Sequence, residues 1–406
     1  MNVAGVKKTM AAVALVCCAA GMWAQTVQQQ PQVHAAWSER AAQAAMVRWP
    51  GGHLDGGKQS FKYELGTYLE GIDAVYQKTG DPRYYSYMKS AVDELVTPDG
   101  AIPTYKPEEF QLDSILMGRQ LLRLYATTGD KHYLKASGLL YEQLQKQPRT
   151  PTGGFWHKQR YQNQMWLDGL YMAEPFYAEY VRVTHHEEKF ADVALQFQLV
   201  DEHLRDEKTG LLFHGWDAAK QERWADPQTG RSPEIWARAE GWTVMALVDT
   251  LDYLPENSPS HKSLVEMLQR QAAALVKVQD ASSGLWFQVL DKGGEKGNYL
   301  ESSASCMFVY ALAKGVRKGY LPVSYSAAAE KGYQGILRQF IVTAGNDVSV
   351  TGTVRVGGLG GTPYRDGSYA YYLSEPVVTN DPKGVGPFLM AAAEMEQVAQ
   401  PKKNLK

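Results

Sequence analysis

Apolar residues recur at helical spacing along most of the chain. Two groups at intervals of mostly three and four residues are Leu65, Leu69, Ile72 and Tyr76, and Leu112, Ile115, Leu116, Leu122 and Tyr125. This period places the members of each group on one face of an α-helix. The pattern predicts a succession of amphipathic helices from Lys62 onward, separated by short polar turns.

Two kinds of turn recur between these segments. The triplet Thr-Gly-Asp closes a helix at residues 79–81 and again, 49 residues later, at residues 128–130. A fixed offset of this size indicates a repeating helical hairpin. A polar turn with glycine, followed by a short extended apolar piece, recurs at residues 97–105, 150–158, 207–217 and 281–291.

These turns predict six inner helices. Their expected starting points are Tyr63, Asp113, Asp168, Arg238, Ser303 and the segment after Gly386. Six hairpins in succession favour an all-α fold closed into a ring, the (α/α)6 barrel, with short β-like connections; an open helical solenoid is the alternative. Pro175 either kinks the third helix or shifts its start to Ala173, and Asp168 lies at its N-terminal end in both cases.

The first residues have the layout of a secretory signal peptide. Lys7 and Lys8 precede an apolar run from Met10 to Trp23, which is too short for a comfortable membrane span. We expect residues 1–24 to be removed and residues 25–406 to form a single catalytic domain. The protein is then exported, and periplasmic if its source is a Gram-negative bacterium. Cys306 is the one cysteine of this mature chain, which excludes an internal disulfide.

Composition narrows the range of partners. The chain has 406 residues with a formal net charge of −2 and no basic tract, so neither nucleic acid nor an anionic membrane is an expected partner. Its 24 tyrosines and 10 tryptophans suit a sugar-binding cleft lined with flat aromatic faces. They suit a large helical core equally well. The sequence gives no indication of oligomeric state.

Asp168 is the strongest candidate for chemistry. It lies between Trp166 and a run of tyrosine, methionine and phenylalanine. Apolar surroundings disfavour an ionised carboxylate, so we expect the pKa of Asp168 to be raised. A carboxyl of this kind can give and retake a proton near neutral pH. The alternative interpretation is an N-cap aspartate ahead of an ordinary helix.

Other polar residues occupy equivalent positions, in the turn that leads into an inner helix. They are Asp113, His157, His214, Arg238 and Trp242. If the ring closes, such positions point into one cavity. Each has a structural alternative: an N-cap for the aspartate, a hydrogen-bonded histidine, an Arg238–Glu240 surface ion pair, and a core tryptophan.

The chain lacks the motifs of several other kinds of site. It has no HExxH, no zinc-spaced cysteines or histidines, no Walker loop and no GxSxG elbow. The glycines at 357–361 do not match a dinucleotide fingerprint. His185 and His186 lie in a charged turn that is typical of a solvated surface. We therefore expect no metal and no cofactor, and chemistry carried out by carboxylates.

Four stretches closely resemble a known family of enzymes. They read WHKQRYQNQMWLDGLYMAEPF, WARAEGWTVMAL, YLESSASCMFVYAL and GSYAYYLSEPVVTNDPKGVGPFLMA. They resemble the unsaturated rhamnogalacturonyl hydrolases, glycoside hydrolase family 105, which are related to the unsaturated glucuronyl hydrolases of family 88. The resemblance runs from about Tyr63 to Glu394 and implies an (α/α)6 barrel. It also implies removal of a 4,5-unsaturated uronic acid from the non-reducing end of lyase-generated oligosaccharides.

The resemblance implies roles for individual residues. It makes Asp168 the general acid and base and places Asp113 as its partner near the same sugar ring. The residues matched to substrate-binding positions are Tyr63, His157, Lys158, Trp166, His214, Arg238 and Trp242. Arg238 has the fork geometry that grips a carboxylate. Ser302 and Ser303 start an inner helix, where they either help to hold an anion or act as N-caps.

The implied reaction begins at the double bond. Protonated Asp168 donates to C4, water adds at C5, and the resulting hemiketal opens and releases the neighbouring sugar. A nearby ionised Asp113 would help to keep Asp168 protonated. Two alternatives remain: another (α/α)6 carbohydrate enzyme such as an epimerase or lyase, and a non-catalytic glycan-binding protein. The segment from Thr343 to Ser374 aligns less closely with the family, so Arg365 receives no role.

Overall fold

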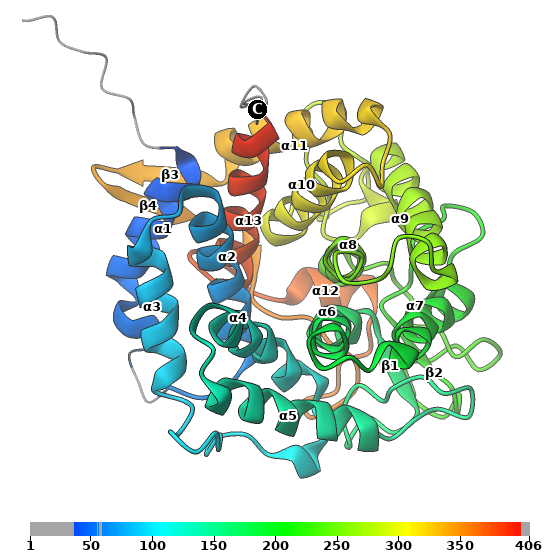
Figure 1. Cartoon of the computed structure of the whole chain (residues 1–406). Helices are drawn as coiled ribbons and strands as arrows, with labels where there is room; N and C mark the ends of the chain where they lie inside the picture. Colours follow the sequence, from blue (N-terminus) through cyan, green and yellow to red (C-terminus); the bar gives the residue numbers. More distant parts are fainter. Residues whose placement is uncertain (1–35, 55, 57–58, 399–406) are drawn as a thin grey trace, which may run out of the picture. The chain divides into compact units, whose positions relative to one another are not determined.

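The inner helices form a closed ring. They are α2 (Tyr63–Thr79), α4 (Gly118–Thr128), α6 (Leu167–Thr184), α8 (Ala237–Thr250), α10 (Ser302–Arg317) and α13 (Pro382–Val398). In the computed structural model, which describes residues 36–54, 56 and 59–398, each inner helix contacts the next and α13 packs against α2 (Figure 1). The predicted (α/α)6 barrel is therefore confirmed, and the open solenoid is wrong.

A second set of helices lies outside this ring. It comprises α1 (Trp37–Arg48), α3 (Pro82–Asp93), α5 (Lys131–Lys146), α7 (Phe190–Leu204), α9 (Pro259–Lys277) and α11 (Ser326–Gln339). Five of them each pack against the inner helix that precedes them, and α1 packs against α13 (Figure 1). The inner helix α8 is buried along its whole length. This explains why most of its residues are apolar, as expected of a helix surrounded by protein.

Short elements connect the hairpins. The strands form three antiparallel pairs: β1 (Gln164–Trp166) with β2 (Gly215–Asp217), β3 (Ile341–Ala344) with β4 (Asp347–Val350), and β5 (Thr353–Val354) with β6 (Val377–Val378). The remaining pieces are α12 (Tyr369–Ser374), η1 (Pro50–Gly52), η2 (Pro107–Glu109), η3 (Leu112–Met117), η4 (Glu187–Lys189), η5 (Leu290–Lys292) and η6 (Val323–Tyr325). The expected short β-like connections are present.

The recurring turns explain where the hairpins begin and end. Gly80 and Gly129 are left-handed and end α2 and α4, a conformation that glycine adopts without steric cost. The side chains of Asp81 and Asp130 then accept a backbone N–H of the following helix. The glycines of the other four turns, Gly100, Gly153, Gly210 and Gly284, all have φ between 79° and 98°.

The ring closes through glycines of its first and last helices. A β-carbon on Gly71 of α2 would lie 2.7 Å from the carbonyl oxygen of Gly386 in α13. A β-carbon on Gly386 would lie 2.2 Å from the carbonyl oxygen of Thr67. Two backbones can approach this closely because glycine has no side chain. The last inner helix, α13, is thereby packed closely against the first inner helix, α2.

The structure corrects some predicted boundaries. The last inner helix starts at Pro382, before Gly386, and α6 runs from Leu167 through Pro175. Trp166 is the N-cap of α6 and Asp168 lies in its first turn, so the N-cap interpretation of Asp168 is wrong. Asp113 lies in the 3-10 helix η3 that leads into α4, with Gln111 as the N-cap.

The expected signal peptide, residues 1–24, lies outside the described residues. Within the described part of the chain, none of the helices has the length and apolar character needed to span a bilayer.

Cys306 is free and buried in α10, and burial raises the pKa of its thiol well above the ordinary value.

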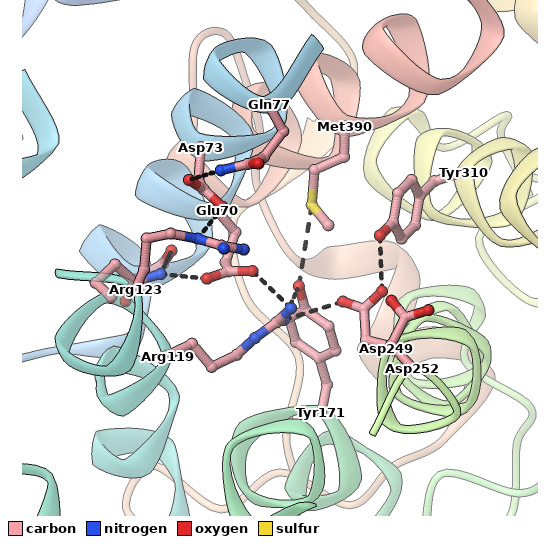
Figure 2. Close-up of polar contacts among 12 residues, drawn as sticks. Glu70, Asp73, Gln77, Arg119, Arg123, Tyr171, Asp249, Asp252, Tyr310 and Met390 are labelled. Atoms are coloured by element: carbon pink, nitrogen blue, oxygen red, sulfur yellow. Dashed lines mark hydrogen bonds and ion pairs between the residues drawn. The ribbon is translucent and has the colours of Figure 1, made fainter. Parts of the chain in front are cut away.

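A network of ion pairs links the inner helices (Figure 2). Arg119 of α4 lies 2.8 Å from Glu70 of α2 and 3.0 Å from Asp249 of α8. Lys314 of α10 lies 2.6 Å from the Asp249 carboxylate. Arg317 of α10 pairs with Glu394 of α13 in the same way. Five of the six inner helices are thus joined by paired charges.

Candidate active site

A cavity of about 320 Å³ opens at the N-terminal ends of the inner helices. Of the eleven residues that the sequence predicts for the site, eight line it: Tyr63, Asp113, His157, Lys158, Trp166, Asp168, Arg238 and Trp242. They come from four hairpins that are far apart in the sequence. The ring therefore brings these residues together in one concave site, as the hairpin repeat predicts.

A short strand pair sets the position of Asp168. Trp166 at the end of β1 pairs with Gly215 at the start of β2, and Leu167 donates a backbone hydrogen bond to the carbonyl of His214. The residue after Leu167 and the residue before Gly215 are consequently neighbours. Asp168 Oδ2 lies 3.0 Å from His214 Nε2. The side chain of Asp168 is 16% exposed, whereas that of His214 is fully buried.

His214 therefore lies behind Asp168 and is absent from the cavity wall. Its expected role in binding substrate stays a prediction, and in this structure its imidazole contacts the Asp168 carboxylate. Its Nδ1 atom lies 2.7 Å from the hydroxyl of Tyr372 in α12. The three side chains form a continuous hydrogen-bonded row that ends at the cavity.

The expected rise in the pKa of Asp168 is also wrong. Burial raises the pKa, but the positive charge of protonated His214 and the hydrogen bond to it outweigh burial and lower the pKa below its ordinary value. The aromatic sequence around Asp168 predicts the burial correctly. It gives no sign of a histidine that lies 46 residues away in the chain. The acid is thus one half of a hydrogen-bonded aspartate–histidine pair.

Asp113 is held by two basic side chains. Lys158 donates to Asp113 Oδ2 over 2.5 Å, and His157 Nε2 lies 3.3 Å from Asp113 Oδ1. Burial lowers the pKa of His157 to about 4, so its imidazole is neutral at pH 7 and donates one N–H. Because Lys158 balances the charge of Asp113, we do not expect this carboxylate to keep Asp168 protonated.

Aromatic rings form one wall of the cavity. The Trp166 ring stacks on the His157 ring at a centroid distance of 4.6 Å and on the Tyr161 ring at 4.6 Å. The Trp242 ring stacks on Tyr171 at 5.0 Å. Protein neighbours already occupy part of each tryptophan surface. The remaining surface, together with Tyr63, is what the wall offers to a ligand.

Arg238 brings a buried positive charge to the cavity. It is 1% exposed, and its Nη1 donates to the carbonyl of Val354 and lies 3.4 Å from Ser303 Oγ. No carboxylate among the described residues lies within ion-pair distance of its guanidinium. The predicted alternative, a surface pair with Glu240, is wrong because both side chains are buried and make no such contact.

Ser302 and Ser303 do not line the cavity. The carboxylate of Glu301 is the N-cap of α10, where it accepts from the backbone N–H of Ala304 and from Ser303 Oγ. The Glu301 carboxylate occupies this helix end and accepts the Ala304 N–H, while the Ser302 N–H donates to the Gly352 carbonyl. An anion site here stays a prediction, and in the structure Ser303 links Glu301 to Arg238.

Comparison with known proteins identifies the family. The model of Glycosyl Hydrolase Family 88 matches residues 37–399. The chain belongs to glycosyl hydrolase family 88. This family 88 chain is 32% identical over 253 residues to the unsaturated rhamnogalacturonyl hydrolase YesR of Bacillus subtilis, covering 61% of this chain and 68% of that protein. It is therefore a glycoside hydrolase.

Solved structures of relatives agree with this assignment. A glycoside hydrolase of family 105 from Clostridium acetobutylicum superimposes with a TM-score of 0.86 at 43% identity, covering 89% of this chain and 99% of that one. An unsaturated glucuronyl hydrolase from Bacillus sp. GL1 superimposes with a TM-score of 0.65 at 13% identity, covering 89% and 95% of the two chains. The second likeness concerns the fold alone.

Several residues of this family 88 site escaped the sequence analysis. Arg365, Arg160 and Lys383 line the cavity, and Tyr372 lies behind His214. Arg365 donates to Tyr161 Oη over 2.8 Å, which ties the 357–367 loop to the Trp166 wall. The less regular segment from 343 to 374 offers no periodic signal that could have placed Arg365 and Tyr372. Among the described residues, no group of three or more histidine, cysteine or acidic side chains has a metal-binding arrangement.

Proposed function

We propose that the protein removes a 4,5-unsaturated uronic acid from the non-reducing end of oligosaccharides produced by polysaccharide lyases. The observation that carries this proposal is Arg238. A buried guanidinium without a carboxylate partner is costly, and the carboxylate of a bound uronate would provide that partner. Its position in the same cavity as Asp168 suits a substrate whose carboxylate lies close to the reacting carbon.

The charge of the cavity wall supports an anionic substrate. Six basic side chains line it: Lys62, Lys158, Arg160, Arg238, Arg365 and Lys383. Three acidic side chains line it: Glu64, Asp113 and Asp168. A concave site with excess positive charge attracts acidic sugars. The name of the relative YesR points to the same class, and rhamnogalacturonan fragments are the first substrates to test.

The Asp168–His214 pair would supply the proton. A substrate carboxylate that enters the cavity adds negative charge, which disfavours ionised Asp168 and moves the shared proton from His214 onto it. Asp168 then donates to C4 of the vinyl ether. A water molecule adds its oxygen to C5 and returns its proton to the carboxylate. The hemiketal so formed opens and releases the neighbouring sugar.

Asp113 would act beside this reaction as a hydrogen-bond acceptor. Its two oxygens are oriented by Lys158 and His157, and the carboxylate lines the cavity. It can therefore accept a hydrogen bond from a sugar hydroxyl or from the attacking water. Because Lys158 balances its charge, it does this without a large electrostatic penalty for an anionic substrate.

The test is hydrolysis of unsaturated disaccharides followed by loss of the double-bond ultraviolet absorbance. Rhamnose-linked and other uronyl disaccharides, compared by kcat/KM, identify the neighbouring sugar. We expect Asp168→Asn to lower kcat roughly 10²–10⁴-fold, the contribution of a positioned acid. Its far-ultraviolet circular dichroism should match that of the unchanged protein, because the amide fills the same volume.

Two controls bound the interpretation. Asp347→Asn, on the exposed strand β4, should leave kcat unchanged. Disaccharides with a saturated terminal uronate should not be cleaved, because they have no enol ether to protonate. Equal cleavage of saturated and unsaturated disaccharides, or near-normal turnover by Asp168→Asn, would contradict the proposal.

A further inference from the structure

Tyr372 occupies a buried position one hydrogen bond behind the aspartate–histidine pair. Its hydroxyl lies 2.7 Å from His214 Nδ1, and its side chain is completely buried. It belongs to α12, in the part of the chain that sequence patterns place least well. Its hydroxyl has no other hydrogen-bond partner among the described residues, so His214 is the group that it serves.

The surrounding structure holds the Tyr372 ring firmly. Its ring stacks on Trp236 at a centroid distance of 5.7 Å and an angle of 16°. Gln288 donates to the carbonyl of Tyr372 over 3.1 Å and accepts from the indole N–H of Trp236 over 3.2 Å. Because the backbone and the ring are both fixed independently of the hydroxyl, removal of the hydroxyl should leave the ring in place.

We propose that Tyr372 is a positioning residue that keeps the proton of the Asp168–His214 pair available for the reaction. The inference rests on the proposed function, since it assigns to Tyr372 a task in the same protonation step. Tyr372 does not touch the cavity, and its effect passes through His214 alone.

The Asp168–His214 pair has two protonation states. When the pair holds its proton, His214 Nδ1 carries a hydrogen and the Tyr372 oxygen accepts it. When the pair has lost its proton to solvent at higher pH, the neutral His214 ring carries its hydrogen on Nε2, facing the Asp168 carboxylate, and Tyr372 donates to the bare Nδ1. A hydroxyl can rotate between these two roles. Both ring nitrogens of His214 are therefore hydrogen-bonded in either state.

A phenylalanine would satisfy neither state. The penalty is larger for the protonated state, because an unpaired charged N–H is more costly to bury than an unpaired neutral acceptor. Tyr372→Phe should therefore make the pair release its proton at a lower pH. Since the reaction needs the protonated pair, the alkaline limb of the activity profile should move toward acid.

Other charged or titratable groups face the pair, and the substitution leaves them unchanged. They are His157 and Lys158 ahead of β1, Asp113 in η3, Glu234 ahead of α8, Arg365 in the loop before α12, and Tyr371. Lys158 balances Asp113, and Glu234 is paired with Lys292 at 2.5 Å. A shift in the profile of Tyr372→Phe is consequently a property of the hydroxyl.

The experiment compares pH profiles of kcat and KM for the full protein and for Tyr372→Phe, with an unsaturated disaccharide as substrate. We expect the alkaline limb of kcat to move down by about one pH unit, which corresponds to about 1.4 kcal/mol. At a pH above that limb, kcat should fall about tenfold while KM stays within about twofold. The matched control is Tyr310→Phe, which removes a buried hydroxyl 2.7 Å from Asp249, away from the cavity.

Identical pH profiles for the protein and for Tyr372→Phe would overturn the inference. So would equal shifts in Tyr372→Phe and Tyr310→Phe. If Tyr372→Phe does not fold, 3-fluorotyrosine at position 372 retains the hydroxyl but makes it a weaker acceptor, and a smaller shift in the same direction is expected.

A second readout separates this inference from the proposed function. The ¹⁵N resonances of the His214 ring report which nitrogen carries hydrogen, and His214→Gln assigns them. If the protein fails to cleave any unsaturated disaccharide, the proposed function is wrong. In that case a His214 titration that moves toward acid in Tyr372→Phe still supports the hydrogen-bonded row, and an unmoved titration refutes it.

Discussion

At one end of the inner barrel the buried charges are paired, whereas at the other end a buried arginine has no carboxylate partner among the described residues. Helix α8 illustrates the difference, because Arg238 is its second residue and Asp249 its second-to-last. Eleven residues of helix separate them by about 16 Å. Arg238 faces the cavity without a carboxylate partner among the described residues. Asp249, by contrast, is contacted by Arg119 and Tyr310 (Figure 2) and also by Lys314.

The pKa values of two carboxyl groups on α8 differ between its two ends. Burial raises the pKa of Asp249, but Lys314 and Arg119 outweigh it and lower the pKa below its ordinary value. Glu240, in the first turn of α8, has no ion-pair partner in the part of the chain that the structure describes, and burial raises its pKa to about 8. The same helix thus carries an ionised carboxylate at one end and a protonated carboxyl group at the other.

The difference shows which end is built for a ligand. A buried charge without a partner lowers stability, and such sites persist where a ligand provides the partner. The paired end joins α2, α4, α8, α10 and α13 and leaves little charge for a ligand to meet. The cavity end retains an unpaired guanidinium and a hydrogen-bonded aspartate–histidine pair. Substitutions at the paired end and at the cavity end test this difference.

The largest effect on folding is expected at the paired end. Asp249→Ala leaves Arg119 and Lys314 buried with one carboxylate partner fewer, and removal of one member of a buried ion network costs about 3–5 kcal/mol. Urea denaturation should show a loss of this size. The values of kcat and KM, measured well below the melting temperature, should not change.

A matched control uses a solvent-exposed pair. Glu142 of α5 is 67% exposed and lies 4.0 Å from Lys146. Glu142→Ala should lower the free energy of unfolding by less than about 1 kcal/mol, as expected for a surface pair. Loss of activity in Asp249→Ala without loss of stability would show that the paired end takes part in function.

The next effect concerns binding at the cavity end. Lysine lacks the second donor of the guanidinium fork, so Arg238→Lys should raise KM for unsaturated uronates about 10–100-fold, or about 1.4–2.8 kcal/mol. The value of kcat should change much less. The methyl ester of the same substrate provides the control, because it has no carboxylate for Arg238 to hold. A similar rise in KM for the ester would place the carboxylate elsewhere.

Sequence patterns predict this architecture well, and the contacts between distant segments less well. Helical periodicity and the glycine turns locate all six inner helices, because both are local signals. They also bring Asp113, His157, Asp168 and Arg238 to one cavity. The neighbours of these residues are not local: the aspartate–histidine pair is made by the β1–β2 ladder, and Tyr372 comes from an irregular segment.

The same limit explains the wrong expectation for the pKa of Asp168. An apolar stretch predicts burial, and burial alone raises the pKa of a carboxyl group. The sign is decided by a cation that only the folded chain brings near. Glu240 is the complementary case, in which burial has no opposing cation among the described residues. Burial raises the pKa of Glu240, which is the shift that the sequence predicts for Asp168. Glu240, however, does not line the cavity.

The smallest effect should therefore appear as a change in the pH dependence of stability in Glu240→Gln. The folded-state pKa of Glu240 is about 8 and its ordinary value is 4.5. Between these values the unfolded chain has lost the proton that the folded protein keeps, so stability falls as pH rises, by at most about 1.4 kcal/mol per pH unit.

Glutamine does not titrate and can still accept from the Leu212 N–H, which lies 3.1 Å from Glu240 Oε2. Urea denaturation from pH 5 to pH 8 should give a shallower decline for Glu240→Gln than for the unchanged protein. Parallel declines would mean that Glu240 is ionised in the folded protein, and that a cation or water compensates for its burial.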